Sequence, residues 1–267
     1  EPVRRGIPCL LYTEALGSYS SRASSCGICG VHGKTTTTGL TGTILKEIPD
    51  FPSQILAGSI INSFGKTCTF TSKNVKDKSI PKEFEITNAP FNSVFVAETC
   101  EYQHHFMSFC PQKILLTSVE SDHQDYYPTY EDIREAFVDY ICKLPPNGDL
   151  IYCADDSGAV ETALIAYNKR PDINLIPYGE SAGGDYQLPF GKVENEKNKF
   201  YLNLFGKEEL YLKVPGKHDV RDAAGAVALV CQMLRYFGKH PVSFVKNIIK
   251  GLESFSGGKR RSEIVGS

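Results

Sequence analysis

The chain has 267 residues, of which 41% are hydrophobic and 22% are charged. These proportions are typical of a folded globular protein, and the length allows one large α/β domain or two small ones. A net charge of −2 and scattered Lys and Arg residues provide no basic stripe, so we expect no nucleic acid and no membrane surface as partner. No apolar run approaches the ~20 residues that a membrane span requires.

The chain contains nine cysteines, an odd number, and several of them lie within apolar runs. This usage favours buried free thiols in a reducing compartment, and we therefore expect a cytoplasmic protein. Cys26 and Cys29 have Cys-x-x-Cys spacing, but the alternation of side chains along a strand predicts that they point to opposite faces. Because no second such pair exists, we expect neither zinc nor redox chemistry.

In chain order, the first elements are a strand over residues 6–12 and a short helix over 13–17. We interpret residues 1–20 as the tail of a preceding domain. From residue 21 onward, strands alternate with helices, and this alternation predicts an α/β fold whose mainly parallel sheet is flanked by helices. The predicted strands lie near 24–29, 54–61, 93–98, 113–119, 149–153 and 173–177, and the predicted helices at 34–47, 129–143 and 157–168.

The remaining segments are less regular. Residues 65–92 are polar and Lys-rich, and we interpret them as hairpins or a mobile excursion. Two short apolar stretches, 199–206 and 209–214, predict a small β-hairpin, and a long helix follows over about 218–237. Pro241 opens a last helix that ends near Leu252. We therefore predict one central domain over 21–254 and a linker over 255–267.

The most distinctive segment is a glycine-containing loop that joins the first strand to the first long helix. Its glycines let backbone N–H groups face an anion, and the helix start adds its positive dipole end. Lys34 would contact the β- and γ-phosphates, and the Thr35 hydroxyl would bind Mg²⁺. Ile28 occupies the place of the first glycine of the strict Walker pattern, so an ordinary strand-to-helix turn is the alternative. The predicted nucleotide site comprises Gly30, Val31, His32, Gly33, Lys34, Thr35 and Thr36.

Acidic and imidazole side chains follow two later strands. Glu98 ends the apolar strand 93–98, and Asp122, His123 and Asp125 follow the strand 113–119. Carboxylate oxygens and neutral imidazole are suitable ligands for a divalent ion, and the carboxyl ends of parallel strands share one edge of a sheet. Each segment taken alone is more often a solvated loop. Their order after the phosphate loop favours a common site.

Five segments, in this order, resemble the Mur ligase family: residues 30–36, 97–102, 121–125, 214–218 and 255–261. The resemblance covers nearly the whole chain and implies the P-loop fold of the central ATP-binding domain, with ATP and Mg²⁺ as cofactors. His32 favours the branch whose full-length members join L-alanine to UDP-N-acetylmuramate, because other members usually carry Asn at this position. The full-length partners implied are those two substrates, and the present segment alone is expected to be inactive.

The resemblance also implies roles for individual residues. Lys34 would neutralise the phosphates, and Thr35 and Glu98 would hold one Mg²⁺. His123 would belong to a second metal or to the acyl-phosphate region, and it completes the predicted metal set. Arg261 matches an arginine that reaches back to the nucleotide, although a solvated linker charge is the alternative. His104 and His105 match nothing in the family and are expected at the surface.

Several positions depart from the family pattern. Cys100 and Gln103 stand where aspartates are common, and Ser262 stands where phenylalanine is usual. Asp219 and Asp222 replace two asparagines that contact the adenine-ribose end of the nucleotide. We expect both aspartates in the first turn of their helix, on one face, where the dipole favours negative charge. They are therefore either cofactor-binding residues or helix-start carboxylates.

Two other functions are compatible with these motifs. One is a related ATP-dependent amide ligase, of the peptidoglycan-recycling or folylpolyglutamate synthase type. His32 and the Asp122–Asp125 context argue against the folate enzyme. The other is a nucleotide-binding module without ligase chemistry. The joint presence of Lys34, Glu98 and His123 argues against such a module.

Overall fold

The protein is described here by a computed structural model, which covers residues 5–6, 9–70, 93–189, 192–194, 197–214 and 216–258. Its main sheet has seven strands in the order β3-β2-β4-β1-β5-β6-β7. All neighbouring strands are parallel except the β2–β3 pair, which is antiparallel. The strands are β1 (Ser24–Cys29), β2 (Ser53–Ile61), β3 (Lys66–Phe70), β4 (Val94–Glu98), β5 (Lys113–Leu116), β6 (Asp149–Cys153) and β7 (Asn174–Tyr178). The predicted α/β class with a mainly parallel sheet is confirmed.

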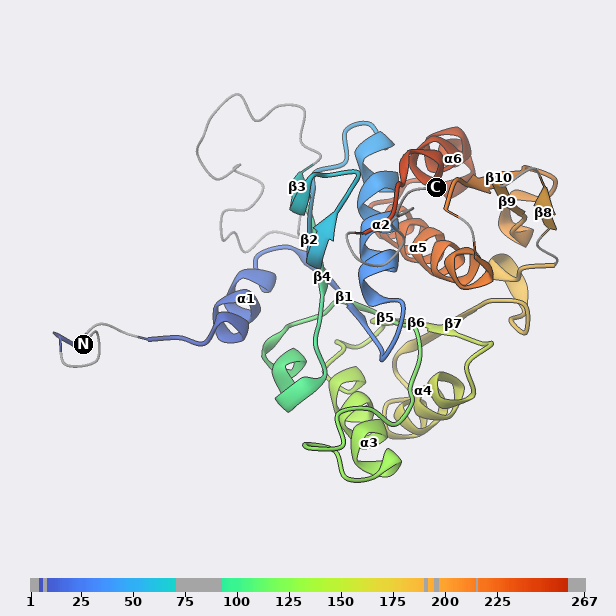
Figure 1. Ribbon diagram of the computed structural model, residues 1–267. Coiled ribbons are helices and arrows are strands. Elements are labelled where there is room, and N and C mark those ends of the chain that lie inside the picture. Colours follow the sequence, from blue (N-terminus) through green and yellow to red (C-terminus); the bar gives the residue numbers. More distant parts are fainter. Residues whose placement is uncertain are drawn as a thin grey trace, which may run out of the picture.

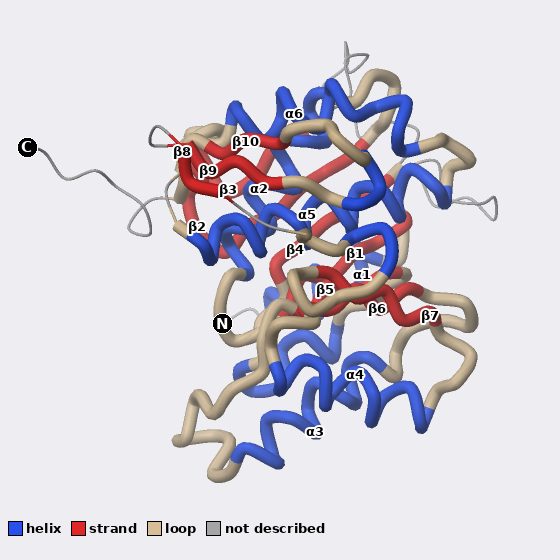
Figure 2. Tube along the Cα trace, turned by 90° about the vertical axis from the view of Figure 1, so that its right-hand side faces the viewer, coloured by secondary structure: helices blue, strands red, loops and turns tan. Residues whose placement is uncertain are grey.

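Helices cover both faces of this sheet. One face carries α2 (Lys34–Glu47), α5 (Lys217–Tyr236) and α6 (Val245–Ser254), and the other carries α3 (Tyr130–Ile141) and α4 (Ser157–Lys169) (Figures 1 and 2). Each face has its own apolar core, and β1 contributes to both because its side chains alternate. Cys26 lies in the core beneath α2 and α5, whereas Cys29 lies in the core beneath α3 and α4. The expectation of opposite faces for this pair is therefore confirmed.

Helix α3 shows how local sequence sets an element boundary. The Thr129 hydroxyl accepts a hydrogen bond from the Asp132 backbone N–H at 3.2 Å, and the Asp132 carboxylate accepts from the Thr129 N–H at 2.9 Å. This reciprocal capping box satisfies N–H groups that the helix itself leaves unpaired. The helix then turns an apolar stripe, which includes Ile133, Phe137 and Tyr140, into the core.

The amino-terminal segment differs from its prediction. Residues 9–11 form no strand, and Leu10, Leu11 and Tyr12 are 67%, 65% and 69% exposed. Among the described residues this segment has no strand to pair with, and α1 (Tyr12–Ser20) begins instead and extends past the predicted helix. The Tyr19 ring packs edge-on against Phe95 of β4 at 5.2 Å. The assignment of residues 1–20 to a preceding domain stays a prediction.

Other boundaries were predicted less accurately than those of β1 and α2. Strand β5 ends at Leu116, three residues earlier than expected. The predicted hairpin exists as β9 (Lys197–Phe200) and β10 (Leu210–Leu212), but the short 3₁₀ helix Asn203–Phe205 occupies part of its connection. Strand β8 (Lys192–Glu194) adds a third, unexpected member to this small antiparallel sheet.

Two predicted segments lie largely beyond the described parts. Of residues 65–92, the structure describes 65–70, which include β3, and the rest falls outside the described residues. Residues 259–267 of the predicted linker also fall outside. Within the described ranges, none of the helices combines the length and apolar character needed to cross a membrane.

Candidate nucleotide-binding site

The glycine loop leaves the carboxyl end of the central strand β1 and enters α2 at Gly33. Gly33 has φ 80° and no side chain caps the helix there, so the helix start is of the kind that binds anions through its N–H groups. Gly30 has φ 133°, and a Cβ at this position would lie 2.1 Å from the Thr117 Oγ1 atom. Both the conformation and the lack of space require glycine at residue 30.

Residues that follow β5 hold this loop in place. The backbone N–H of Val31 donates to the Ser118 carbonyl at 3.1 Å, and that of His32 donates to the Ser118 hydroxyl at 2.9 Å. The Thr117 hydroxyl donates to the Cys29 carbonyl at 3.1 Å. From the sequence, Thr117 and Ser118 are predicted only as the end of a strand. Their hydroxyls, directly after a buried strand, were the available signal for this role.

Lys34 is paired with a buried acid. Its Nζ atom lies 3.0 Å from each carboxylate oxygen of Glu101, and it also donates to the carbonyl groups of Gly30 and Val31. Glu101 is only 1% exposed, so its charge depends on this cation for compensation. From the sequence, Glu101 is identified only as part of the segment 97–102 that resembles the family. The structure makes Glu101 the acceptor for Lys34.

Glu98 occupies a second polar cluster beside the phosphate loop. Its carboxylate oxygens accept hydrogen bonds from the Thr35 hydroxyl at 2.9 and 3.0 Å and from the Gly58 backbone N–H at 2.7 Å. Gly58 was not predicted to take part, yet a Cβ there would lie 2.8 Å from the Glu98 carboxyl carbon. A hydroxyl and a carboxylate are the hard oxygen donors that Mg²⁺ prefers, so this pair fits a magnesium ion.

His123 belongs to a different group from Glu98. Its Nε2 atom lies 3.5 Å from a Glu101 carboxylate oxygen and 3.7 Å from an Asp122 oxygen. One potential ligand atom from each of Glu101, Asp122 and His123 lies within 4.8 Å of the others. The structure therefore associates Thr35 with Glu98, and His123 with Glu101 and Asp122.

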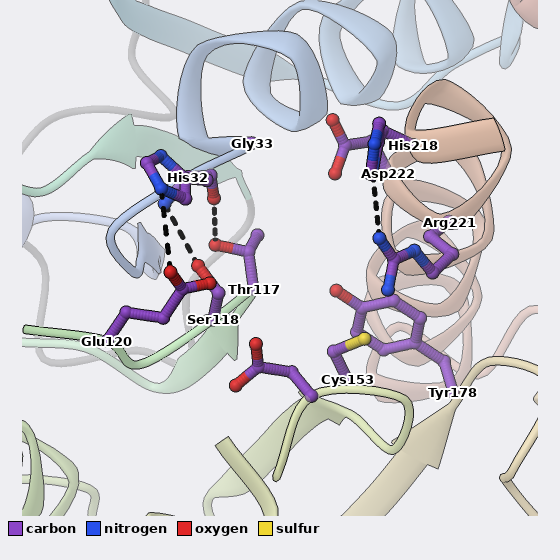
Figure 3. Close-up of a pocket in the computed structure, with 11 residues that line it drawn as sticks. His32, Gly33, Thr117, Ser118, Glu120, Cys153, Tyr178, His218, Arg221 and Asp222 are labelled. Atoms are coloured by element: carbon purple, nitrogen blue, oxygen red, sulfur yellow. Dashed lines mark hydrogen bonds and ion pairs between the residues drawn. The ribbon is translucent and has the colours of Figure 1, made fainter. Parts of the chain in front are cut away.

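A cavity of about 330 Å³ adjoins the loop at Gly33 and extends toward β6 and β7. In Figure 3, His32, Thr117, Ser118 and Glu120 form one wall, and residues of α5 form the facing wall. On the α5 side, an Arg221 guanidinium nitrogen lies 2.8 Å from the His218 Nδ1 atom. Cys153 and Tyr178 line the end of the cavity that faces the sheet. The volume lies at the lower end of the range typical of small-molecule sites.

The two aspartates of α5 do not share one environment. Asp219 lies in the first helical turn, as predicted, but Asp222 is the sixth residue of a helix that begins at Lys217, so its placement in the first turn was wrong. Asp222 lines the cavity, and a Cβ on Gly33 would lie 2.5 Å from its carboxylate. Asp219 instead lies against Gly216, and burial raises the pKa of its carboxyl group.

The remaining predicted site residues are placed as follows. Val31 and Thr36 flank the loop and are half-buried, whereas the His32 side chain is 73% exposed and lies 3.9 Å from Glu120. His104 is exposed and His105 is half-buried. Arg261 lies outside the described residues, so its predicted role stays a prediction.

The family model described as the Mur ligase middle domain matches residues 28–230, which is more than half of the chain. The chain therefore belongs to the Mur ligase family, by its middle domain.

Named relatives agree with this assignment. The chain is 42% identical, over its whole length, to a UDP-N-acetylmuramate–L-alanine ligase of Treponema pallidum, and 33% identical over 97% of its length to one of Borreliella burgdorferi. These matches cover 51% and 50% of the two relatives, so the chain spans about half the length of the curated relatives it matches.

Solved structures share the fold. The UDP-N-acetylmuramate:L-alanyl-gamma-D-glutamyl-meso-diaminopimelate ligase from Neisseria meningitides superimposes with a TM-score of 0.72 and 18% identity, over 97% of this chain and 74% of that one. The UDP-N-acetylmuramate-alanine ligase from Thermotoga maritima gives a TM-score of 0.66 and 21% identity, over 94% and 48%. At these identities the likeness concerns the fold alone.

Proposed function

We propose that this chain is the ATP-binding central part of a UDP-N-acetylmuramate–L-alanine ligase, which forms an amide bond through an acyl phosphate in peptidoglycan synthesis. The relatives of 42% and 33% identity carry this activity in their names. The observation that carries the proposal is the position of Lys34, at the open start of α2 and in contact with the buried Glu101 carboxylate after β4.

The proposed chemistry places the phosphates of ATP along residues 30–36. Lys34 would exchange part of its contact with Glu101 for the β- and γ-phosphates, and the cavity beside Gly33 would take the nucleoside. Thr35 and Glu98 would hold Mg²⁺, which, when bound, supplies charge neutralisation for phosphoryl transfer. A substrate carboxylate accepts the γ-phosphoryl group, and an amine then displaces phosphate. Phosphoryl transfer depends mainly on positioning and electrostatics, which these residues provide.

The first test removes the charge that binds phosphate. A single Lys34→Ala substitution would also leave the buried Glu101 carboxylate without its cation, which would destabilise the protein. The better variant is the double substitution Lys34→Met, Glu101→Gln, which removes both charges. Calorimetry with ATP and Mg²⁺ should show binding weakened by about 1.5–3 kcal/mol, the range for hydrogen bonds to charged groups.

The matched control is Lys46→Met, which removes an exposed lysine from the far end of the same helix. This variant should bind ATP as the parent does. Parental ATP affinity in a folded Lys34→Met, Glu101→Gln protein would contradict the proposed site.

A related amide ligase of the peptidoglycan-recycling or folylpolyglutamate synthase type is the second candidate. The fold resembles that of a folylpolyglutamate synthase complex with a TM-score of 0.70, but at 14% identity this likeness shows the fold alone. The named relatives at higher identity favour the alanine-adding ligase. A third candidate, a nucleotide-binding module without ligase chemistry, would bind ATP in the same assay and show no turnover in a full-length protein.

A further inference from the structure

His123 and two residues of a neighbouring segment adopt left-handed backbone conformations, although none of the three is glycine. Gln103 and His104 have φ of 51° and 55°, and His123 itself has φ of 52°. Such conformations are costly for residues with a Cβ, and they persist where surrounding contacts enforce them. They lie in two connections, which we call the β4 loop and the β5 loop. The β4 loop is residues 99–105 and includes the first residues of the 3₁₀ helix Tyr102–Ser108, and the β5 loop is residues 120–127.

The two loops are joined by tyrosine contacts. The Tyr102 ring of the β4 loop packs on the His123 imidazole, with ring centres 4.8 Å apart and planes inclined by 48°. The Tyr102 hydroxyl donates a hydrogen bond to the Asp125 carboxylate at 2.8 Å. From the β5 loop, the Tyr127 hydroxyl donates to the Glu101 carbonyl at 2.6 Å. Contacts in both directions therefore fix the β4 loop against the β5 loop.

Tyr102 acts on His123 from two sides. Its ring restricts the rotation of the imidazole, and its hydroxyl anchors the β5 loop two residues beyond His123. The result is a His123 Nε2 atom held 3.5 Å from Glu101 and 3.7 Å from Asp122. Partners that orient a ligand in this way affect metal affinity without touching the metal.

We propose that Tyr102 is a positioning residue that holds His123 beside Glu101 for a divalent cation. The inference rests on the proposed function, because it concerns the cation that would accompany ATP. Tyr102 lies in a surface loop and does not belong to the buried core of the sheet. Its removal should therefore affect His123 far more than the stability of the fold.

The test measures Mn²⁺ binding to the 267-residue chain in the presence of ATP, by electron paramagnetic resonance. His123→Ala identifies the Mn²⁺ that depends on the imidazole. At the Mn²⁺ site that depends on His123, Tyr102→Leu should weaken Mn²⁺ binding about 10- to 100-fold. This is the range for loss of a residue that orients a metal ligand without touching the metal. Tyr102→Phe keeps the ring and loses only the bond to Asp125, so it should weaken binding less. ATP affinity measured with EDTA should remain parental in both variants.

Tyr167→Phe is the matched control, because Tyr167 is a 38% exposed tyrosine of α4 and belongs to neither loop. It should leave Mn²⁺ binding unchanged. Parental Mn²⁺ affinity in Tyr102→Leu would overturn this inference and leave the proposed function standing. A crystal structure of that variant with His123 still 3.5 Å from Glu101 would do the same. Failure of the parent chain to bind ATP would overturn the proposed function as well.

Discussion

Asp222 places a carboxylate next to the start of α2, where phosphates are expected to bind. It lines the cavity, and its oxygen approaches the space above Gly33 (Figure 3). An ionised aspartate can only accept hydrogen bonds, whereas asparagine can both accept and donate. A negative charge at this position should therefore oppose binding of an anionic nucleotide and remove a donor that adenine could use.

We predict that the double substitution Asp219→Asn, Asp222→Asn tightens ATP binding by about 1–3 kcal/mol, the scale of one good bidentate base contact. Because only Asp222 of the two lines the cavity, Asp222→Asn alone should reproduce the gain. Asp219→Asn alone is the control and should leave ATP affinity unchanged. Calorimetry would measure all three variants.

Comparison of ligands separates the two physical causes. If Asp222 acts on the phosphates, Asp222→Asn should tighten ATP, GTP and inorganic tripolyphosphate alike. If it acts on the base, ATP alone should gain affinity. Unchanged or weaker ATP binding in Asp222→Asn would contradict an effect of Asp222 on nucleotide binding and would indicate a purely structural role.

The buried thiol of Cys26 makes the free energy of unfolding depend on pH in the alkaline range. Burial is the largest cause that raises the pKa of its thiol from 9.0 to about 12, and Asp149 adds to the rise while Lys113 opposes it. Between these two pKa values the folded protein keeps a proton that the unfolded chain has lost. The contribution to stability is therefore fully present below pH 9.0 and declines as pH rises toward 12.

We predict that Cys26→Ala makes the alkaline fall in unfolding free energy shallower, by about 1.4 kcal/mol per pH unit. Urea unfolding between pH ~9.5 and ~11 would measure the slope. Other buried groups contribute to the parental slope, so the difference between proteins is the relevant quantity. Cys110→Ala, at an exposed cysteine, should keep the parental slope. Equal slopes for Cys26→Ala and the parent would contradict this prediction.

At the scale of the element, α3 depends on a cap that can be removed without touching the core. Thr129→Ala eliminates the acceptor for the Asp132 N–H and should lower the unfolding free energy by about 1 kcal/mol. Thr129→Ser keeps a hydroxyl and should retain most of the stability. Urea unfolding would rank the three proteins, and a Thr129→Ser protein as unstable as Thr129→Ala would contradict the capping role.

Elements with strong local signals were predicted well from the sequence. Helix α2 has the predicted bounds, because glycines mark its start, even though Gly39 and Gly42 lie within it. Strand β6 likewise matches, between the turn at Asn147 and the helix that Asp156 caps. Such signals lie within a few residues of the element that they define.

The contacts that complete the site were not predictable in the same way. Lys34 and Glu101 are 67 positions apart, and Thr35 and Glu98 are 63 apart. These pairs meet because β4 lies beside β1 in the sheet, and no local pattern specifies that order. Gly58 reaches Glu98 for the same reason, since β2 pairs with β4. The sequence predicted the residue types of the site and, through the family resemblance, the association of Thr35 with Glu98, but it did not predict the pairing of Lys34 with Glu101.

At the scale of the whole molecule, the sheet order brings the three functional loops together. β1 lies between β4 and β5, so the loops at their carboxyl ends meet at one edge of the sheet, where α/β proteins bind ligands. The candidate nucleotide site is therefore formed by loops at the carboxyl ends of these three strands. The names of the relatives specify two substrates besides the nucleotide, UDP-N-acetylmuramate and L-alanine. The chain spans about half the length of those relatives.

We therefore predict that the 267-residue chain alone binds ATP with Mg²⁺ but does not join L-alanine to UDP-N-acetylmuramate. Many enzymes close domains around their substrates before reaction, and this chain spans about half the length of the relatives that carry the activity in their names. The chain would be incubated with both substrates and ATP, and the product sought by mass spectrometry. The full-length Treponema pallidum relative, run in parallel, would show that the assay detects product. Formation of UDP-N-acetylmuramoyl-alanine by the isolated chain would contradict the prediction, because the residues between β1 and α6 would then suffice for both substrates.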